Sequence, residues 1–230
     1  MLKYISDTVH YTEVLALVLK VKRSLWIGTA DIKDLYVKVG SQMMPFLAVL
    51  AELIKKGVEV RLIHAKEPGP AFREDFDKYP ALFDGLERAL CPRVHFKILV
   101  FDGQVAYIGS ANLTGAGIGM KGDGTRNFEA GILTDNPELV EQAMNQFDDV
   151  WIGKYCKNCK RKEFCGDPIG RVSYANNTHF LRVKSGCRII CAYHYGSWIK
   201  SNVLDETTIK ETINEGKYTH AKLIEEPGMV

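Results

Sequence analysis

The chain has 230 residues, 46% of them hydrophobic, which is enough to bury one sizeable core with a small appendage. Its 30 Lys+Arg and 28 Asp+Glu give a formal net charge of +2, which excludes a uniformly basic nucleic-acid platform. No stretch approaches the roughly 18 apolar residues of a membrane span, and no signal peptide is visible. We therefore expect a cytoplasmic protein without a transmembrane segment, in which the six cysteines are thiols or metal ligands rather than disulfides.

The N-terminal part alternates predicted strands and helices, judged from apolar periodicity and from glycine and proline positions. Strands are expected over residues 2–5, 24–30 and 58–64, and helices over residues 11–21, 42–56 and 72–90. Pro80 interrupts the last helix, and Gly57 ends the one before it. This rhythm predicts a layered α/β domain.

A set of polar residues follows on a predicted hairpin. His95 and Lys97 stand two apart, so on a strand both side chains leave the same face. Asp102 begins the hairpin turn, and the returning strand delivers Ser110 and Asn112 beside the start of the first strand. An imidazole, an ammonium, a hydroxyl and a carboxamide then converge. This set suits a phosphodiester, because the lysine supplies charge, the serine and asparagine supply donors, and the histidine can attack phosphorus.

The alternative is a hairpin with incidental polar residues. His64 and His220 also begin His-x-Lys triplets, and neither has the aspartate or the Gly-Ser-x-Asn that follow the triplet at His95. The complete spacing is His-x-Lys-x4-Asp-x6-Gly-Ser-x-Asn. Six fixed residues across eighteen positions are far more selective than the triplet alone, so the functional interpretation is preferred.

This spacing resembles the signature of the phospholipase D superfamily, and the resemblance extends over residues 1–153. It implies a phospholipase D-like α-β-α sandwich with a central mixed sheet. It also implies that Glu129 holds the second ring nitrogen of the catalytic histidine and fixes its tautomer. The catalytic set implied in this way is His95, Lys97, Asp102, Ser110, Asn112 and Glu129.

In that superfamily two motifs face each other across one site. One histidine forms a phosphohistidine, and the other protonates the leaving oxygen and then activates water. Because this chain has one motif, the resemblance implies a homodimer with the site on its two-fold axis. The first hypothesis is a metal-independent phosphodiesterase that acts on nucleic acid. The alternatives are a phospholipase or phosphatidyl-transferring enzyme acting on phospholipid, and a nucleic-acid-binding protein or scaffold without turnover.

Beyond the motif, a glycine-rich loop spans residues 115–124, and a strand and a helix are expected over residues 128–133 and 137–150. The loop is either a mobile segment at the mouth of the site or an ordinary surface loop.

The composition changes in residues 154–230, a cysteine-rich extension with predicted strands over residues 171–174, 180–184 and 188–195 and a helix over residues 206–214. From Trp151 onward there are 13 Lys+Arg and 8 Asp+Glu, a net +5 against −3 for the rest. Basic residues beside Tyr155 and Phe164 suit single-stranded nucleic acid, and a solvated charged loop is the alternative.

The extension also carries Cys-x2-Cys-x5-Cys, in which the first two thiolates are oriented toward one ion. A tetrahedral site needs a fourth ligand, for which Cys187 and Cys191 are candidates, with His179 behind them and Cys91 remote. We expect structural zinc, with an iron–sulfur cluster or inert thiols as alternatives. The preferred ligands are Cys156, Cys159, Cys165 and Cys187.

Overall fold

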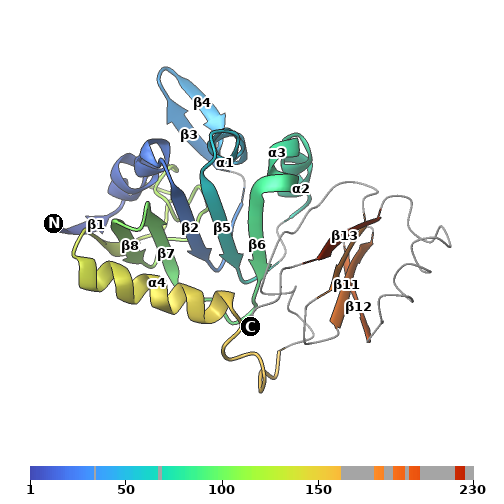
Figure 1. Cartoon of the computed structure of the whole chain (residues 1–230). Helices are drawn as coiled ribbons and strands as arrows, with labels where there is room; N and C mark the ends of the chain where they lie inside the picture. Colours follow the sequence, from blue (N-terminus) through green and yellow to red (C-terminus); the bar gives the residue numbers. More distant parts are fainter. Residues whose placement is uncertain are drawn as a thin grey trace.

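A seven-stranded mixed sheet forms the centre of the computed structural model, which describes residues 1–33, 35–66 and 69–161 together with four later strands. The strand order is β1-β9-β8-β7-β2-β5-β6 (Figure 1). β2, β5 and β6 run parallel to one another, whereas β7 lies antiparallel to β2. The strands are β1 (Leu2–Ser6), β2 (Ser24–Thr29), β5 (Glu59–His64), β6 (Leu86–Leu90), β7 (Lys97–Phe101), β8 (Val105–Gly109) and β9 (Ala130–Thr134).

Helices cover both faces of this sheet. On one face α4 (Pro137–Trp151), drawn in front of the strands in Figure 1, buries Phe147 and its neighbours against Trp26 and Val100. The second core, on the other face, joins Leu25 and Leu99 to the remaining helices. These are η1 (His10–Leu15), η2 (Val18–Lys20), α1 (Phe46–Lys55), α2 (Pro70–Asp77) and α3 (Pro80–Gly85). All five residues of β7 are buried, as expected of a strand covered on both sides, and the predicted α-β-α sandwich is confirmed.

The predicted helix over residues 42–56 is wrong at its start. Residues Gln42–Pro45 form β4, which pairs with β3 (Tyr36–Val39) in a separate hairpin that projects from the domain (Figure 1). Gly40 turns this hairpin with a φ of 61°, a value that glycine adopts at little cost. Helix α1 begins only after Pro45, whose backbone is extended.

The predicted helix over residues 72–90 is wrong at its end. Its last five residues form β6, which pairs in parallel with β5. The short helix α3 lies so close to α1 that a Cβ on Gly85 would meet Ile54 Cγ2 at 2.1 Å. The helix ends at Gly85 and a strand follows directly. Its alternation is visible at the start, where Leu86 and Arg88 are buried and Glu87 between them is half-buried.

The remaining predictions fall partly outside the described residues. The predicted helix over residues 11–21 is present as a π turn and a 3-10 turn around a short helical stretch. A second sheet has the order β12-β11-β10-β13, and the predicted strands 180–184 and 188–195 are confirmed with small changes in their ends. Its strands are β10 (His179–Val183), β11 (Ile189–His194), β12 (Ser197–Asn202) and β13 (Ala221–Glu225). The predicted strand 171–174 and helix 206–214 lie outside the described residues, and the division after residue 153 stays a prediction. Among the described helices, none is long and apolar enough to cross a bilayer.

Candidate active site

A buried lysine and an exposed histidine stand at the start of β7. Lys97 is the first residue of the strand and is 5% exposed, whereas His95 precedes the strand and is exposed. The ammonium donates a hydrogen bond to the carbonyl oxygen of His95 at 2.7 Å. Burial lowers the pKa of Lys97, and the negative charge of Glu129 opposes that shift. The site therefore contains one cation with little hydration of its own, next to the candidate nucleophile.

Ser110 joins this group from the neighbouring strand. Lys97 is paired with Gly109 across the β7–β8 ladder, so the serine follows directly beside the lysine. The serine hydroxyl donates to a carboxylate oxygen of Glu129, and the other oxygen accepts from Asn127 Nδ2 at 3.1 Å. Within the described residues no hydrogen bond joins Glu129 to the ring of His95, so its role in fixing the tautomer stays a prediction.

Tyr107 supports the turn that carries the serine. Its hydroxyl accepts a hydrogen bond from the backbone N–H of Ala111 at 3.4 Å. A Cβ at Gly109 would lie 2.3 Å from the tyrosine hydroxyl oxygen, and one at Gly131 would lie 2.4 Å from its ring. Only glycine therefore fits at this position of the Gly-Ser-x-Asn sequence, because the ring and hydroxyl of buried Tyr107 occupy the space of a side chain. The same tyrosine fixes the position of the turn relative to the sheet.

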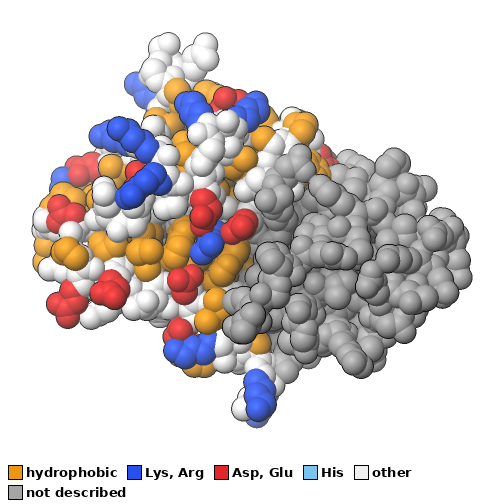
Figure 2. Space-filling view, in the orientation of Figure 1, with side chains coloured by type: hydrophobic (Ala, Val, Ile, Leu, Met, Phe, Trp, Pro, Cys, Tyr) orange, Lys and Arg blue, Asp and Glu red, His pale blue; other side chains and the backbone are white. Residues whose placement is uncertain are grey.

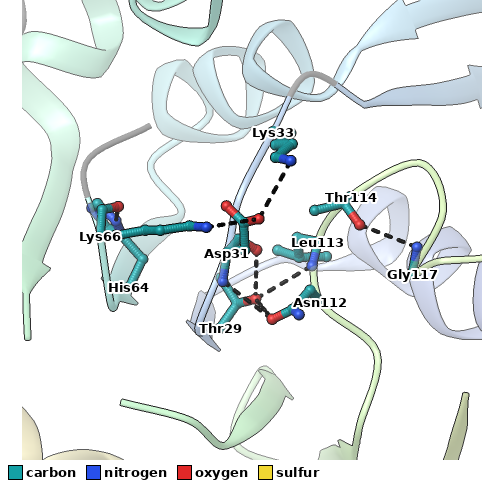
Figure 3. A network of polar contacts seen from close by, with 9 residues as sticks. All are labelled: Thr29, Asp31, Lys33, His64, Lys66, Asn112, Leu113, Thr114 and Gly117. Carbon is teal, nitrogen blue, oxygen red and sulfur yellow. Dashed lines mark hydrogen bonds and ion pairs between the residues drawn. The ribbon is translucent and has the colours of Figure 1, made fainter. Parts of the chain in front are cut away.

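Asn112 is held by the end of β2. Its side-chain oxygen accepts from the backbone N–H of Asp31 at 3.1 Å and from the Thr29 hydroxyl at 3.3 Å (Figure 3). The backbone of Leu113 donates to the same hydroxyl at 3.3 Å. Because the carboxamide oxygen is used in this way, its NH2 group is the part that can donate to a ligand.

Two lysines that the sequence did not single out lie next to this asparagine. The carboxylate of Asp31 lies 3.6 Å from Lys33 Nζ and 3.5 Å from Lys66 Nζ, and Figure 3 shows the two lysines reaching it from different sides. Each lysine side chain is 65% exposed, whereas the aspartate is 18% exposed. The available signal was topological, since both lysines follow the carboxyl ends of adjacent parallel strands, where ligands bind in open α/β sheets.

Asp102 lies at the opposite end of β7, away from these residues. Its carboxylate accepts from the backbone N–H groups of Lys22, Arg23 and Ser24, at distances from 2.7 to 3.1 Å. Burial raises the pKa of this carboxyl, but the three hydrogen bonds together outweigh it and leave the pKa below its ordinary value. The structure thus gives Asp102 a role in joining β2 to the β7–β8 hairpin, not in contacting substrate.

His64, from the second His-x-Lys triplet, is a buried structural residue. Its Nδ1 lies 2.7 Å from the carbonyl oxygen of Lys66, and its Nε2 accepts from Arg88 Nε. Burial, followed by the charge of Arg88, holds the pKa of His64 well below its ordinary value, so the ring is neutral. The third triplet, at His220, begins outside the described residues.

The glycine-rich segment 115–124 is anchored to the domain. Ile118 is fully buried, and a Cβ on Gly119 would lie 2.6 Å from the carbonyl oxygen of Asp7. This contact ties the segment after the Gly-Ser-x-Asn sequence to the start of η1.

An exposed apolar row crosses three strands beside the site. Tyr4, Ile132 and Ile108 are direct neighbours on β1, β9 and β8 and therefore share one face of the sheet. They are 71%, 41% and 37% exposed, and Phe128, next to Glu129, is 93% exposed. Figure 2 shows hydrophobic side chains reaching the surface among charged ones on the side from which α4 is seen. We call these four residues the apolar edge.

The predicted metal ligands are described only in part. Cys156 and Cys159 lie in turns after α4, and both are half-buried, whereas Cys165 and Cys187 lie outside the described residues. Within the described part of the chain, no group of three or more His, Cys, Asp or Glu side chains is arranged to hold a metal ion.

Comparison with known proteins identifies a family. The family model described as "Cardiolipin synthase, PLD-like domain" matches residues 16–151, more than half of the chain. No curated protein matches. Among solved structures, the chain is similar to NucT from Helicobacter pylori, with 15% identity, a TM-score of 0.48 and coverage of 74% of this chain and 99% of that one. It is also similar to Nuc, a phospholipase D family member from Salmonella typhimurium, with 18% identity, a TM-score of 0.49 and coverage of 66% and 94%.

Proposed function

Because this chain belongs to the phospholipase D-like family, we propose that it is a metal-independent phosphodiesterase that cleaves nucleic acid at a site shared by two chains. The observation that carries the proposal is the convergence at one end of the sheet. Buried Lys97, the Ser110–Glu129 pair and the anchored Asn112 lie there beside exposed His95. A phosphate group needs such a cation and donors around it, with a nucleophile left accessible.

The chemistry assigned to His95 is nucleophilic. One ring nitrogen attacks phosphorus, a P–N bond forms, and the P–O bond to the leaving group breaks. The His95 of a second copy gives its proton to the departing oxygen and then takes a proton from the water that cleaves the P–N bond. Lys97 and the NH2 group of Asn112 bind the non-bridging oxygens and stabilise the charge of the transition state.

The apolar edge supports a second copy as the source of the other histidine. It lies next to Ser110 and Glu129, because Ile108 precedes Gly109 and Phe128 precedes the glutamate. Contiguous exposed apolar residues beside a half-complete site are suited to self-association, and a two-fold axis there brings two sites together.

Nucleic acid is favoured as substrate by the two lysines bridged by Asp31. Their ammonium groups lie in the loops around Asn112, and a polynucleotide presents further phosphates on either side of the one that is cleaved. A substrate with a single phosphodiester gains less from charges outside the reaction centre. The pair therefore supports a polyanion.

The second candidate is phosphatidyl transfer or phospholipid hydrolysis. Two observations favour it: the matched family model is described by the name cardiolipin synthase, and the projecting β3–β4 hairpin exposes Met43 and Tyr36. Exposed apolar side chains along a projecting hairpin can enter the surface of a bilayer.

To test this proposal, the full chain is incubated in EDTA with labelled single-stranded DNA, single-stranded RNA, duplex DNA or anionic phospholipid vesicles, and cleavage of each is measured. We expect cleavage of a nucleic acid that persists in EDTA and is abolished by His95→Ala, whereas Lys38→Ala on the hairpin retains activity. Circular dichroism checks that each variant is folded. A strict requirement for added magnesium, or turnover of the phospholipid alone, would contradict the proposal. Binding without turnover in every case would identify the non-catalytic alternative.

A further inference from the structure

A buried threonine at the end of β2 lies beside the candidate active site. Thr29 is the last residue of this strand and is 1% exposed. It stands 83 positions before Asn112 in the chain, so the spacing of the motif does not include it. A polar side chain buried to this extent needs hydrogen-bond partners. The partners that the structure describes for this hydroxyl all lie in the segments that carry Asp31 and Asn112.

The hydroxyl of Thr29 makes three contacts, which lie together at the centre of Figure 3. Its oxygen lies 2.8 Å from the carbonyl oxygen of Asp31 and 3.3 Å from Asn112 Oδ1. It also accepts from the backbone N–H of Leu113 at 3.3 Å. A hydroxyl has one proton, so the shorter contact, to the carbonyl of Asp31, is the main hydrogen bond that it donates. With one contact donated and one accepted, the hydroxyl is fixed in its orientation.

These contacts direct a backbone N–H at the carboxamide of Asn112. The hydrogen bond from Thr29 to the carbonyl of Asp31 closes a local turn, and the N–H of the same aspartate donates to Asn112 Oδ1 at 3.1 Å. Because an N–H can only donate, the carboxamide must present its oxygen to it. The NH2 group of Asn112 is thereby left facing away from this N–H.

Backbone contacts attach the same two segments to each other. The N–H of Lys33 donates to the carbonyl of Leu113 at 3.0 Å, and Ile32 forms an isolated parallel bridge with the same leucine. Ile32 and Leu113 are each 1% exposed. Both backbone groups of the residue after Asn112 are therefore bonded to residues 29–33, the N–H through the threonine hydroxyl and the carbonyl through Lys33.

The preceding residue, Gly28, places the same strand end against the other half of the motif. It pairs with β7, and a Cβ added to it would lie 2.2 Å from the ring of Phe96, the residue between the histidine and the lysine of the motif. Glycine is therefore required for this close approach of β2 to that ring. Since the end of β2 is packed against the segment that carries the lysine, Thr29 holds Asn112 at a fixed position relative to it.

We propose that Thr29 is a positioning residue of the active site, which sets the direction in which the Asn112 carboxamide meets the reacting phosphate. This role rests on the proposed phosphodiesterase function, in which the NH2 group of Asn112 binds a non-bridging oxygen. Thr29 itself does not touch the substrate, because its side chain is buried. Its hydroxyl keeps a donor in the geometry that the transition state needs, so its loss should reduce kcat rather than substrate binding.

Thr29→Val removes the hydroxyl and keeps the shape of the side chain. The variant leaves the N–H of Leu113 without its acceptor and opens the turn at Asp31. We therefore expect kcat on labelled nucleic acid to fall by about 10- to 100-fold while KM changes little, since a donor at the transition state is displaced. Thr29→Ser retains the hydroxyl and should keep most of the wild-type kcat.

Thr134→Val is the matched control, because Thr134 is also fully buried. Its hydroxyl donates to the carbonyl of Met1 and accepts from the N–H of Asn136, both at 3.0 Å. It lies at the end of β9 that is remote from Glu129. This variant loses a comparable pair of hydrogen bonds away from the site, so it should be less stable and retain kcat. Urea titration compares the stability of the variants.

NMR provides a measurement that needs no catalysis. In Thr29→Val the backbone amide of Leu113 should exchange with solvent about tenfold faster or more, since its acceptor is lost, and the side-chain NH2 signals of Asn112 should shift. Thr29→Ser and Thr134→Val should leave both close to the wild type. If the wild type turns over no substrate, the proposed function fails, and these signals alone decide whether Thr29 orients the carboxamide.

Three results would overturn the positioning role. The first is an equal loss of kcat in Thr29→Val and Thr134→Val, which would reflect stability alone. The second is an effect of Thr29→Val confined to KM. The third is a set of Asn112 NH2 signals that do not move in Thr29→Val.

Discussion

At the scale of single residues, the site depends on a buried ammonium that is kept charged. Burial lowers the pKa of Lys97, and the nearby Glu129 carboxylate opposes this shift. The protonated form binds the phosphate, so activity should fall as the pH rises through the pKa of Lys97. That alkaline limb should lie below the ordinary lysine pKa of about 10.4.

Glu129→Gln removes the opposing negative charge and should move the alkaline limb of kcat/KM to lower pH, by about one unit if the charge acts across a partly buried contact. Circular dichroism across the same pH range separates loss of charge from unfolding. Lys97→Met should lower kcat by about 100-fold or more at every pH, since one preorganised charge in the transition state is lost. If the alkaline limb of the kcat/KM profile does not move in Glu129→Gln, a group other than Lys97 is responsible for that limb.

The lysine pair makes a separate prediction about substrate binding. Lys33→Ala combined with Lys66→Ala should raise KM for a long oligonucleotide by about tenfold and reduce the slope of log affinity against log salt by nearly two, since two phosphate contacts are lost. kcat should change little, because neither lysine lies at the reacting phosphate in this account. Lys22→Ala, at the opposite end of β2, is the matched control. An unchanged salt slope in the double variant would show that the pair does not contact substrate.

The sequence predicted the residues of the motif but not this pair. The motif residues could be identified from the sequence because they lie on one local hairpin, in which a fixed spacing along the chain becomes a fixed position in space. These residues are His95, Lys97, Ser110 and Asn112. Lys33 and Lys66 meet only through Asp31, after β2 and β5 have paired in parallel. No spacing within the chain encodes that contact.

At the scale of elements, Asp102 is the clearest case in which a motif residue supports the fold. It accepts three backbone hydrogen bonds from residues 22–24, so it fastens the start of β2 to the β7–β8 hairpin. Its pKa is below the ordinary value, so the unfolded chain binds a proton before the folded chain does. The stability that it contributes is therefore complete above the ordinary carboxyl pKa of about 3.9 and is lost as the pH falls through the folded value.

Asp102→Asn should lower the free energy of unfolding at neutral pH by about 1–3 kcal/mol, the usual cost of weakening hydrogen bonds to a carboxylate. Urea titrations at several pH values measure this. The difference from the wild type should shrink below about pH 4 as the native carboxyl itself is protonated. A difference that stays constant down to pH 2 would contradict the assigned role.

Strands β4 and β6 were wrongly predicted as parts of helices from their apolar periodicity. The apolar residues Met43 and Leu86 fit helical spacing, yet both lie in strands, because a strand and a helix can bury the same short apolar run. Pairing decides between them: β4 pairs with β3, and β6 extends the parallel edge of the sheet beside β5. The central mixed sheet and the α-β-α layers followed from the resemblance, whereas the strand order and these boundaries depended on tertiary partners.

At the scale of the whole molecule, the proposed mechanism requires two copies of the chain. The apolar edge formed by Tyr4, Ile108, Ile132 and Phe128 is the surface assigned to the second copy, and it adjoins the side chains that would act with the partner's histidine. Each complete site then contains two histidines with different tasks. In a mixture of wild-type and His95-deficient chains, the activity should therefore fall more steeply than the fraction of wild-type chains. If each chain held a complete site, the activity would fall in proportion to that fraction.

The most direct test mixes the two kinds of chain. Wild-type and His95→Ala chains with different tags are co-expressed at equal levels, and homodimers and heterodimers are separated by tag. Random pairing leaves about one dimer in four with both histidines, so the unseparated mixture should show about a quarter of the wild-type steady-state activity. The purified heterodimer should release at most one product per site without further turnover. Heterodimers with half of the wild-type activity would mean that each chain holds a complete site, and the shared-site account would be wrong.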